Sequence, residues 1–128
     1  MTYDNYKHTN LTKKIINAFY NVYNTLGYGF LEKVYENAMV IELTSMELLV
    51  EQQRRVDVFY EGIRVGNYFA DLIINDKIIV ELKASKNICE EHEFQLINYL
   101  RATEIEVGLL FNFGKKPEFK RKVFSNSS

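Results

Sequence analysis

Two neighbouring segments of this chain, 64–74 and 77–84, carry apolar residues on both faces of the strands that they predict. Successive side chains of a strand point to opposite faces, so a half-exposed strand shows a single apolar set. Here one set comprises Leu72, Ile74, Ile78, Val80 and Leu82, and the other comprises Phe69, Ile73 and Ile79. A sheet that is apolar on both faces is covered on both faces. The two segments therefore predict an α/β sandwich with a central sheet.

The remaining elements follow from apolar periodicity and turn residues. Helices are expected over 10–26, after Gly29 and over 90–102, and strands over 49–60, 64–74, 77–84, 107–113 and 119–124. Glu61-Gly62 and Asn75-Asp76 are turn pairs of the hairpin type. The first three strands then form an antiparallel meander within a mixed central sheet, with helices on both faces.

Two helix details can be stated from the pattern. In the second helix one apolar face is formed by Leu31, Val34, Tyr35, Ala38 and Ile41. Glu32 and Glu36 lie four residues apart on another face, next to Met39, Val40 and Leu43. At the third helix, Asn87-x-x-Glu90 predicts the capping box that begins it.

Length and composition indicate one domain over residues 1–128, with frayed ends at 1–8 and 125–128. Cys89 is the single cysteine, which excludes a disulfide framework and a cysteine zinc site and fits a reducing, cytoplasmic setting. We see no signal peptide. The longest apolar stretches are far shorter than the roughly 20 residues that span a bilayer, so no membrane association is expected.

The charge balance argues against a strongly basic nucleic-acid binder, because the net charge is −1 and the pI is near 6.1. The distribution is less neutral than the total. Five basic residues gather near the C-terminus, interrupted by Glu118: Lys115, Lys116, Lys120, Arg121 and Lys122. They are candidate phosphate contacts, and an edge strand protected by lysines explains them equally well.

Asp71 and the run Glu81-x-Lys83 place three chemically active groups on the two apolar strands. A two-residue turn at Asn75-Asp76 would put Asp71 opposite Val80, on the wrong face. A three-residue loop pairs Ile74 with Ile78 and puts Asp71 opposite Glu81, with Cβ atoms about 5 Å apart. A slip of one residue makes or destroys this pairing, and we expect the three-residue loop or an equivalent bulge. Lys83 shares the face of Glu81.

Paired carboxylates on an apolar sheet either take up a proton or hold a cation. Carboxylate oxygens with retained waters suit Mg²⁺ or Mn²⁺, which polarise phosphoryl oxygens and acidify bound water. Lys83 could then orient the attacking water or stabilise transition-state charge. A buried ion-pair cluster of Asp71, Glu81 and Lys83 is the plainer alternative.

Residues of the helices extend the candidate site. His92, Gln95 and Tyr99 form one stripe on the third helix. For His92 we favour a position near the helix start without a role in the site, whereas Gln95, among apolar neighbours, would need hydrogen-bond partners if buried. Glu32 is either a third carboxylate directed toward the sheet or an exposed acid at a helix N-terminus.

At this point the chain resembles the PD-(D/E)XK nuclease superfamily, in the order of its elements and in its motifs. More narrowly it is similar to the small GxxExxxxxR protein family, and the similarity covers about Thr9 to Val123. The residues that carry it are Gly27-Tyr28-Gly29-Phe30-Leu31-Glu32-x-x-Tyr35, Tyr68-x-Ala70-Asp71-Leu72, Ile79-Val80-Glu81-Leu82-Lys83-Ala84, Gln95-Leu96-x-Asn98-Tyr99-Leu100 and Val107-Gly108-Leu109-Leu110-x-Asn112-Phe113-Gly114.

The resemblance implies a restriction-endonuclease-like core with Asp71, Glu81 and Glu32 as ligands of Mg²⁺ or Mn²⁺ and Lys83 as the catalytic lysine. It also implies that Gln95 and Tyr99 support the site or touch substrate. Ala70 stands where the superfamily's leading proline would be. The family's arginine position, counted from Gly29-x-x-Glu32, falls on Ala38, so no arginine is assigned to phosphate binding.

These expectations together describe a metal-dependent nuclease that hydrolyses phosphodiester bonds, with DNA favoured over RNA as its partner. The near-neutral charge suggests weak binding alone or a homodimer that pools its basic patches. The rival interpretation is a non-catalytic nucleic-acid-binding or protein-interaction module that retains the same fold.

Overall fold

The structure is a computed structural model, and it describes residues 7–125. The ends expected to fray therefore fall mostly outside the described residues. Lys7, at the start of the described chain, forms an ion pair with Glu106 and accepts a hydrogen bond from Arg121 at its carbonyl. No helix within 7–125 has the length and apolar character needed to cross a membrane.

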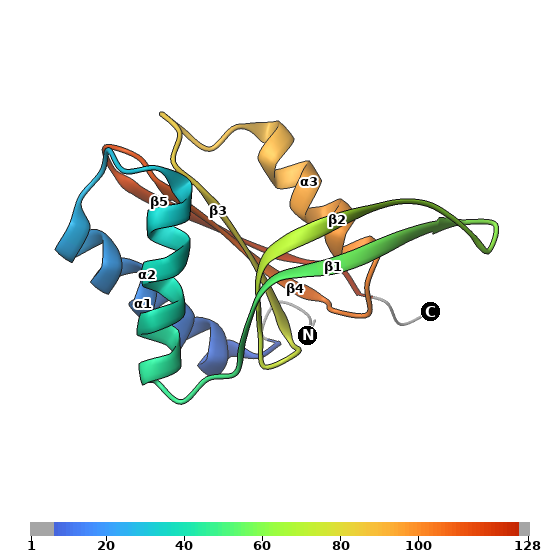
Figure 1. The fold of residues 1–128 in the computed structure, drawn as a ribbon, viewed down its shortest axis with the longest axis horizontal. Coiled ribbons are helices and arrows are strands. Elements are labelled where there is room, and N and C mark those ends of the chain that lie inside the picture. Colours follow the sequence, from blue (N-terminus) through green and yellow to red (C-terminus); the bar gives the residue numbers. More distant parts are fainter. Residues whose placement is uncertain (1–6, 126–128) are drawn as a thin grey trace.

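The described chain folds into three helices and five strands (Figure 1). In chain order they are α1 (Thr9–Leu26), α2 (Glu32–Ser45), β1 (Val50–Tyr60), β2 (Ile63–Ile74), β3 (Ile78–Lys83), α3 (Glu90–Arg101), β4 (Val107–Phe113) and β5 (Pro117–Val123). The expected elements are all present, with boundaries that differ by at most a few residues.

The strands form one mixed sheet in the order β1-β2-β3-β4-β5. β1, β2 and β3 make the expected antiparallel meander, and β4 lies parallel to β3 because α3 carries the chain back across the sheet. Glu61 and Gly62 connect β1 to β2 with φ angles of 51° and 77°. Two successive residues in the left-handed region are typical of the tight hairpin turn that this pair predicts.

The loop between β2 and β3 has the three-residue form. Ile74 pairs with Ile78, Ile73 with Ile79 and Leu72 with Val80. Asn75 and Asp76 adopt φ angles of 52° and 57°, and the Lys77 amide donates to the Ile74 carbonyl over 2.9 Å. Continuing this register places Asp71 opposite Glu81, as expected.

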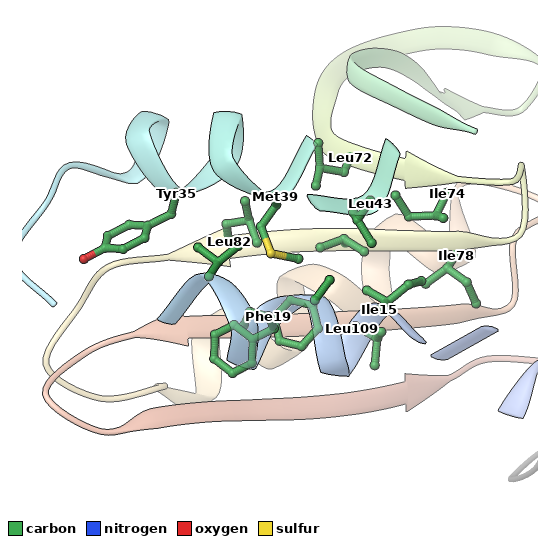
Figure 2. Packing of buried hydrophobic residues seen from close by; sticks show 14 of the residues in the cluster. Ile15, Phe19, Tyr35, Met39, Leu43, Leu72, Ile74, Ile78, Leu82 and Leu109 are labelled. Atoms are coloured by element: carbon green, nitrogen blue, oxygen red, sulfur yellow. The ribbon is translucent and has the colours of Figure 1, made fainter. Parts of the chain in front are cut away.

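Apolar side chains bury both faces of the sheet. On one face Phe19 of α1 and Tyr35 of α2 belong to a cluster with side chains of β2, β3 and β4 such as Leu72 and Leu82 (Figure 2). On the other face Leu96 and Leu100 of α3 meet a smaller cluster that includes Ile79. The sandwich predicted from the doubly apolar strands is therefore confirmed.

The inward face of α2 differs from the apolar face described from the sequence. Its buried residues are Tyr35, Glu36, Met39 and Leu43. Leu31 and Ile41 of the expected face are 79% and 73% exposed. Both sides of this helix carry apolar residues, so tertiary packing rather than the helical pattern decided its rotation. The result turns Glu36 toward the sheet.

The start of α3 also differs from expectation. Cys89, rather than Asn87, is the N-cap residue, and His92 accepts the Cys89 amide at its Nδ1 atom over 3.4 Å. The capping box therefore lies two residues further along than Asn87-x-x-Glu90. His92 has a structural role at the helix start, which agrees with the reading favoured for it.

Strand β2 changes the faces that its side chains occupy near Asp71. Leu72 and Ile74 pack in the cluster under α1 and α2, whereas Ala70 packs in the cluster under α3. Residues two apart in a regular strand share a face, so the strand is irregular between Ala70 and Leu72. Beyond this point the β1–β2 hairpin reaches past the rest of the sheet (Figure 1).

Candidate functional site

Asp71 and Glu81 each accept a main-chain amide of the other's strand where the β2–β3 ladder ends. The Asp71 amide donates to Glu81 Oε2 over 2.9 Å, and the Leu82 amide donates to Asp71 Oδ2 over 2.9 Å. The last regular pair is Leu72 with Val80. Each carboxylate thus replaces a ladder acceptor, and this exchange fixes the two side chains beside each other.

Burial makes this pair electrostatically unusual. Glu81 is 7% exposed, and desolvation, followed by the charge of Asp71, raises its pKa to about 8. Desolvation likewise raises the pKa of Asp71, against the opposing effect of the hydrogen bond from Leu82. Burial and the neighbouring charge therefore both favour the protonated form of Glu81.

Glu81 keeps one oxygen for a further ligand, whereas both oxygens of Asp71 accept a hydrogen bond. Glu81 Oε1 accepts no hydrogen bond from residues 7–125, and no buried side-chain oxygen of that range lacks a partner. Oε1 therefore reaches solvent. Asp71 Oδ1 accepts only the amide of Gln53, over 3.2 Å.

Lys83 supplies a positive charge near the pair. Its ammonium lowers the pKa of both Asp71 and Glu81. It forms no ion pair within the described part of the chain. The three groups therefore do not form the closed ion-pair cluster that was the plainer alternative, and the Lys83 ammonium remains available to a ligand.

Glu36 of α2 is the helix acid that adjoins the pair, and it was not singled out from the sequence. It is 4% exposed, and its charge raises the pKa of both Asp71 and Glu81. Its oxygens accept Lys33 Nζ over 3.0 Å, Gln52 Nε2 over 2.6 Å and Gln53 Nε2 over 3.0 Å. Three donors thus satisfy the oxygens of this one buried carboxylate.

Gln53 connects Glu36 to Asp71. Its Nε2 group donates to Glu36 Oε1 over 3.0 Å and to Asp71 Oδ1 over 3.2 Å. The residue lies opposite Asp71 in β1 and adopts a φ of 55°, in the left-handed region that glutamine disfavours. Strained backbone of this kind concentrates at functional sites. The adjacent glutamines Gln52 and Gln53 of β1 were the sequence signal for this bridge.

Glu32, the acid expected from the sequence, lies one turn earlier on α2. It is exposed, and its Oε2 accepts the amide of Ala84 over 3.3 Å. It does not contribute to the shifted pKa of Asp71 or Glu81. The rotation of α2 therefore brings Glu36 to the carboxylate pair and places Glu32 past the end of β3.

Two tyrosines of the α3 side complete the surroundings. Tyr68 of β2 stacks on Tyr99 of α3 with ring centroids 3.6 Å apart, and its hydroxyl donates to the Tyr99 carbonyl. Burial, followed by the charge of Glu81, raises the pKa of Tyr99 to about 12. Gln95 is exposed rather than buried and hydrogen-bonds the Tyr99 side chain.

The basic C-terminal residues separate into two groups. Lys122 pairs with Glu93 over 2.6 Å, and Arg121 donates to the carbonyl of Lys7. Lys115 and Lys116 lie in the turn before β5 and, like Lys120, are exposed without an ion pair within residues 7–125. Phosphate contact is therefore open to Lys115, Lys116 and Lys120.

The oxygens of Asp71 and Glu81 suit a hard divalent cation that takes few of its ligands from the protein. Among residues 7–125 no three His, Cys, Asp or Glu side chains gather closely enough to hold a metal ion. Asp71 and Glu81 offer two oxygens, and Mg²⁺ commonly uses one or two carboxylates together with waters and substrate phosphate. The Gln53 amide lies between Glu36 and Asp71 and donates to both carboxylates.

Comparison with known proteins agrees with this architecture. The family described as "PD-(D/E)XK nuclease superfamily" matches residues 9–122. A solved structure entitled "Crystal structure of SSO0001" has a similar fold, with a TM-score of 0.56, 20% identity and 74% of this chain covered. This chain spans about half, 52%, of that protein's length. No match was found among curated proteins.

The mixed sheet, its helices on both faces and the match over residues 9–122 agree with a restriction-endonuclease-like fold. The chain belongs to the PD-(D/E)XK nuclease superfamily.

Proposed function

We propose that this protein is a metal-dependent nuclease that hydrolyses phosphodiester bonds, with DNA as its preferred substrate. The observation that carries the proposal is the pair of half-buried Asp71 and buried Glu81, each fixed by the other's strand. Glu81 Oε1 is left for a ligand, and Asp71 Oδ1 is contacted only by Gln53. Placement in the GxxExxxxxR family, and a homodimer that pools basic residues, belong to the same proposal.

Each residue has a distinct task in this scheme. Asp71 and Glu81 would hold Mg²⁺ or Mn²⁺, with Glu36 as the third acid in place of Glu32. The bound ion would polarise a phosphoryl oxygen and lower the pKa of a water. Lys83, whose ammonium has no acidic partner within the described residues, stabilises charge on the phosphate or orients the attacking water. Gln95 and Tyr99 line the α3 side and support this geometry.

The direct test combines metal binding with hydrolysis. Mn²⁺ is titrated calorimetrically into the wild type, Asp71→Asn, Glu81→Gln and Lys83→Ala, and cleavage of labelled DNA is then followed in Mn²⁺. Both carboxylate variants should lose Mn²⁺ binding and cleavage, whereas Lys83→Ala should keep binding and lose at least about 100-fold in rate. Glu104→Gln, which changes an exposed acid, is the matched control and should behave as wild type.

A non-catalytic binding module is the second candidate. It is favoured by the absence of a three-acid cluster among residues 7–125. A wild-type protein that binds nucleic acid but neither binds Mn²⁺ nor cleaves DNA or RNA would establish the module and refute the nuclease. Nucleic-acid affinity that is unchanged in Glu81→Gln would support the binding module only if cleavage is also absent.

A further inference from the structure

An open pocket of about 750 Å³ lies directly past the C-terminal end of β3. This volume falls within the usual range for ligand sites. After β3 the first residue that lines the pocket is Ala84, which directly follows Lys83. Three segments form the walls: the α1–α2 loop, the β3–α3 loop and the β4–β5 turn. Figure 1 shows these segments together at one end of the sheet.

The chemistry of the walls is aromatic and cationic. Tyr28 and Phe30 of the α1–α2 loop line the pocket with 56% and 47% of their surfaces exposed. Lys86, Lys115 and Lys116 line it as well, against a single acid, Glu118. None of the three lysines forms an ion pair within the chain from 7 to 125. Exposed rings beside unpaired lysines match a base and its phosphates.

Buried side chains hold the aromatic wall in place. Tyr35 donates its hydroxyl to the Gly27 carbonyl over 2.7 Å and accepts the Phe30 amide over 3.2 Å, and its ring stacks on Phe113. Gly27 and Gly29 have φ angles of 71° and 110°, which side chains rarely allow. The loop that presents Tyr28 and Phe30 is therefore shaped before any ligand arrives, which reduces the entropy lost on binding.

The two lysine-bearing walls are held in a similar way. Asn112, fully buried, accepts the Ser85 amide over 2.9 Å and donates to the Ser85 carbonyl over 2.9 Å. The Tyr23 hydroxyl lies 2.7 Å from the carbonyls of both Gly114 and Lys115. At Gly114 a Cβ atom would lie 2.7 Å from the Ser85 carbonyl oxygen. These contacts account for the Asn112-Phe113-Gly114 motif, which the carboxylate site leaves unexplained.

We infer that this pocket binds one splayed-out nucleotide of a single-stranded nucleic acid, with its base on Tyr28 or Phe30 and its phosphates on Lys86, Lys115 and Lys116. The inference rests on the proposed function and narrows its substrate to strands whose bases are unpaired. Glu81 to Ala84 spans about 10 Å along an extended strand, so a bound base lies a short step from the carboxylates. A paired base in a duplex cannot offer its face to these rings.

The test measures binding without metal, in EDTA, by fluorescence anisotropy of a short labelled strand. The same sequence is used as single-stranded DNA, single-stranded RNA and blunt duplex. Either single strand should bind more tightly than the duplex, and the tighter of the two identifies the substrate sugar. Tyr28→Ala should weaken single-strand binding about 5-fold or more, and Lys115→Ala with Lys116→Ala should weaken it further.

Matched controls are available on the same fold. Phe59→Ala removes an aromatic residue that is 61% exposed at the hairpin, and Lys13→Ala removes an exposed lysine of α1. Neither residue lines the pocket, so single-strand affinity should stay at the wild-type value. Thermal melting checks that Tyr28→Ala folds normally, and Phe30→Ala provides a second test of the wall. Equal binding of strand and duplex, no binding, or unchanged affinity in both aromatic variants would overturn the pocket assignment.

Failure of this inference differs visibly from failure of the nuclease. Binding that depends on Tyr28 but is never followed by Mn²⁺-dependent cleavage supports the pocket and removes the catalytic proposal. Mn²⁺-dependent cleavage that is lost in Glu81→Gln, while Tyr28→Ala binds and cleaves normally, overturns the pocket and keeps the nuclease.

Discussion

At the residue scale, hydrogen bonds from main-chain amides hold Asp71 and Glu81 beside each other. Each carboxylate accepts an amide that the sheet would otherwise pair, so the two acids keep their positions without a ligand. The hydrogen bonds fix the positions of the two carboxyl groups. Burial and mutual repulsion nevertheless destabilise their charged forms, because both oppose ionisation. A preorganised pair of this kind binds a cation without first having to move.

The proton on Glu81 predicts how stability depends on pH. Its pKa is about 8 in the folded chain against 4.5 for the free group, so the folded state binds a proton that the unfolded state releases between those values. The contribution is complete below pH 4.5 and is lost as pH rises toward 8, by up to about 5 kcal/mol. Urea denaturation in EDTA at pH 5, 7 and 9 should show this fall in the free energy of unfolding.

Glu81→Gln is the control for that measurement, because the amide cannot titrate and can still accept the Asp71 amide. The variant should lose most of the pH dependence and be more stable than wild type at pH 9. A smaller fall should remain, since the pKa of Asp71 is raised as well. Parallel pH curves for the two proteins would contradict the assigned proton.

At the scale of elements, the rotation of α2 decides which acid joins the site. Glu36 lies one turn after Glu32, and the burial of Tyr35 and Met39 turns it toward Gln53 and the carboxylate pair. Glu36→Gln should therefore weaken Mn²⁺ binding about tenfold or more. Glu32→Gln should change it less than about twofold, because Glu32 contacts Ala84 instead. Calorimetry at pH 8 measures both, and the reverse order of effects would refute this placement.

The strands could be predicted from sequence much better than that helix rotation. β2 and β3 carry apolar residues on both faces, so their pairing and the helices that cover them follow from burial. The three-residue loop follows from the requirement that Asp71 lie opposite Glu81. In α2, by contrast, apolar residues occur on both sides, and only packing against the sheet selects Tyr35 and Met39 over Leu31 and Ile41. The Gln53 bridge depends on the irregularity of β2, which no local pattern specifies.

At the scale of the whole molecule, the near-neutral charge hides a strong separation of charge. Buried acids occupy the middle of the sheet, and Glu90, Glu91 and Glu93 fill the first turn of α3. Unpaired lysines gather instead at the pocket past β3. A nucleic acid approaching this surface is attracted by the pocket lysines and repelled by the acids at the start of α3, so this charge pattern sets its orientation more than its affinity.

This separation predicts a shallow salt dependence with a local origin. Each phosphate contact to a single strand contributes a slope of about −0.7 in log affinity against log salt, so the three pocket lysines give about −2. Anisotropy titrations in EDTA over a range of NaCl concentrations measure the slope. Lys115→Ala combined with Lys116→Ala should reduce it to about −0.7, because only Lys86 remains at the pocket, whereas Lys13→Ala should leave it unchanged. An unchanged slope in the double variant would mean that the phosphates bind elsewhere on the molecule. The proposed path of the strand from the pocket to Asp71 and Glu81 would then be wrong.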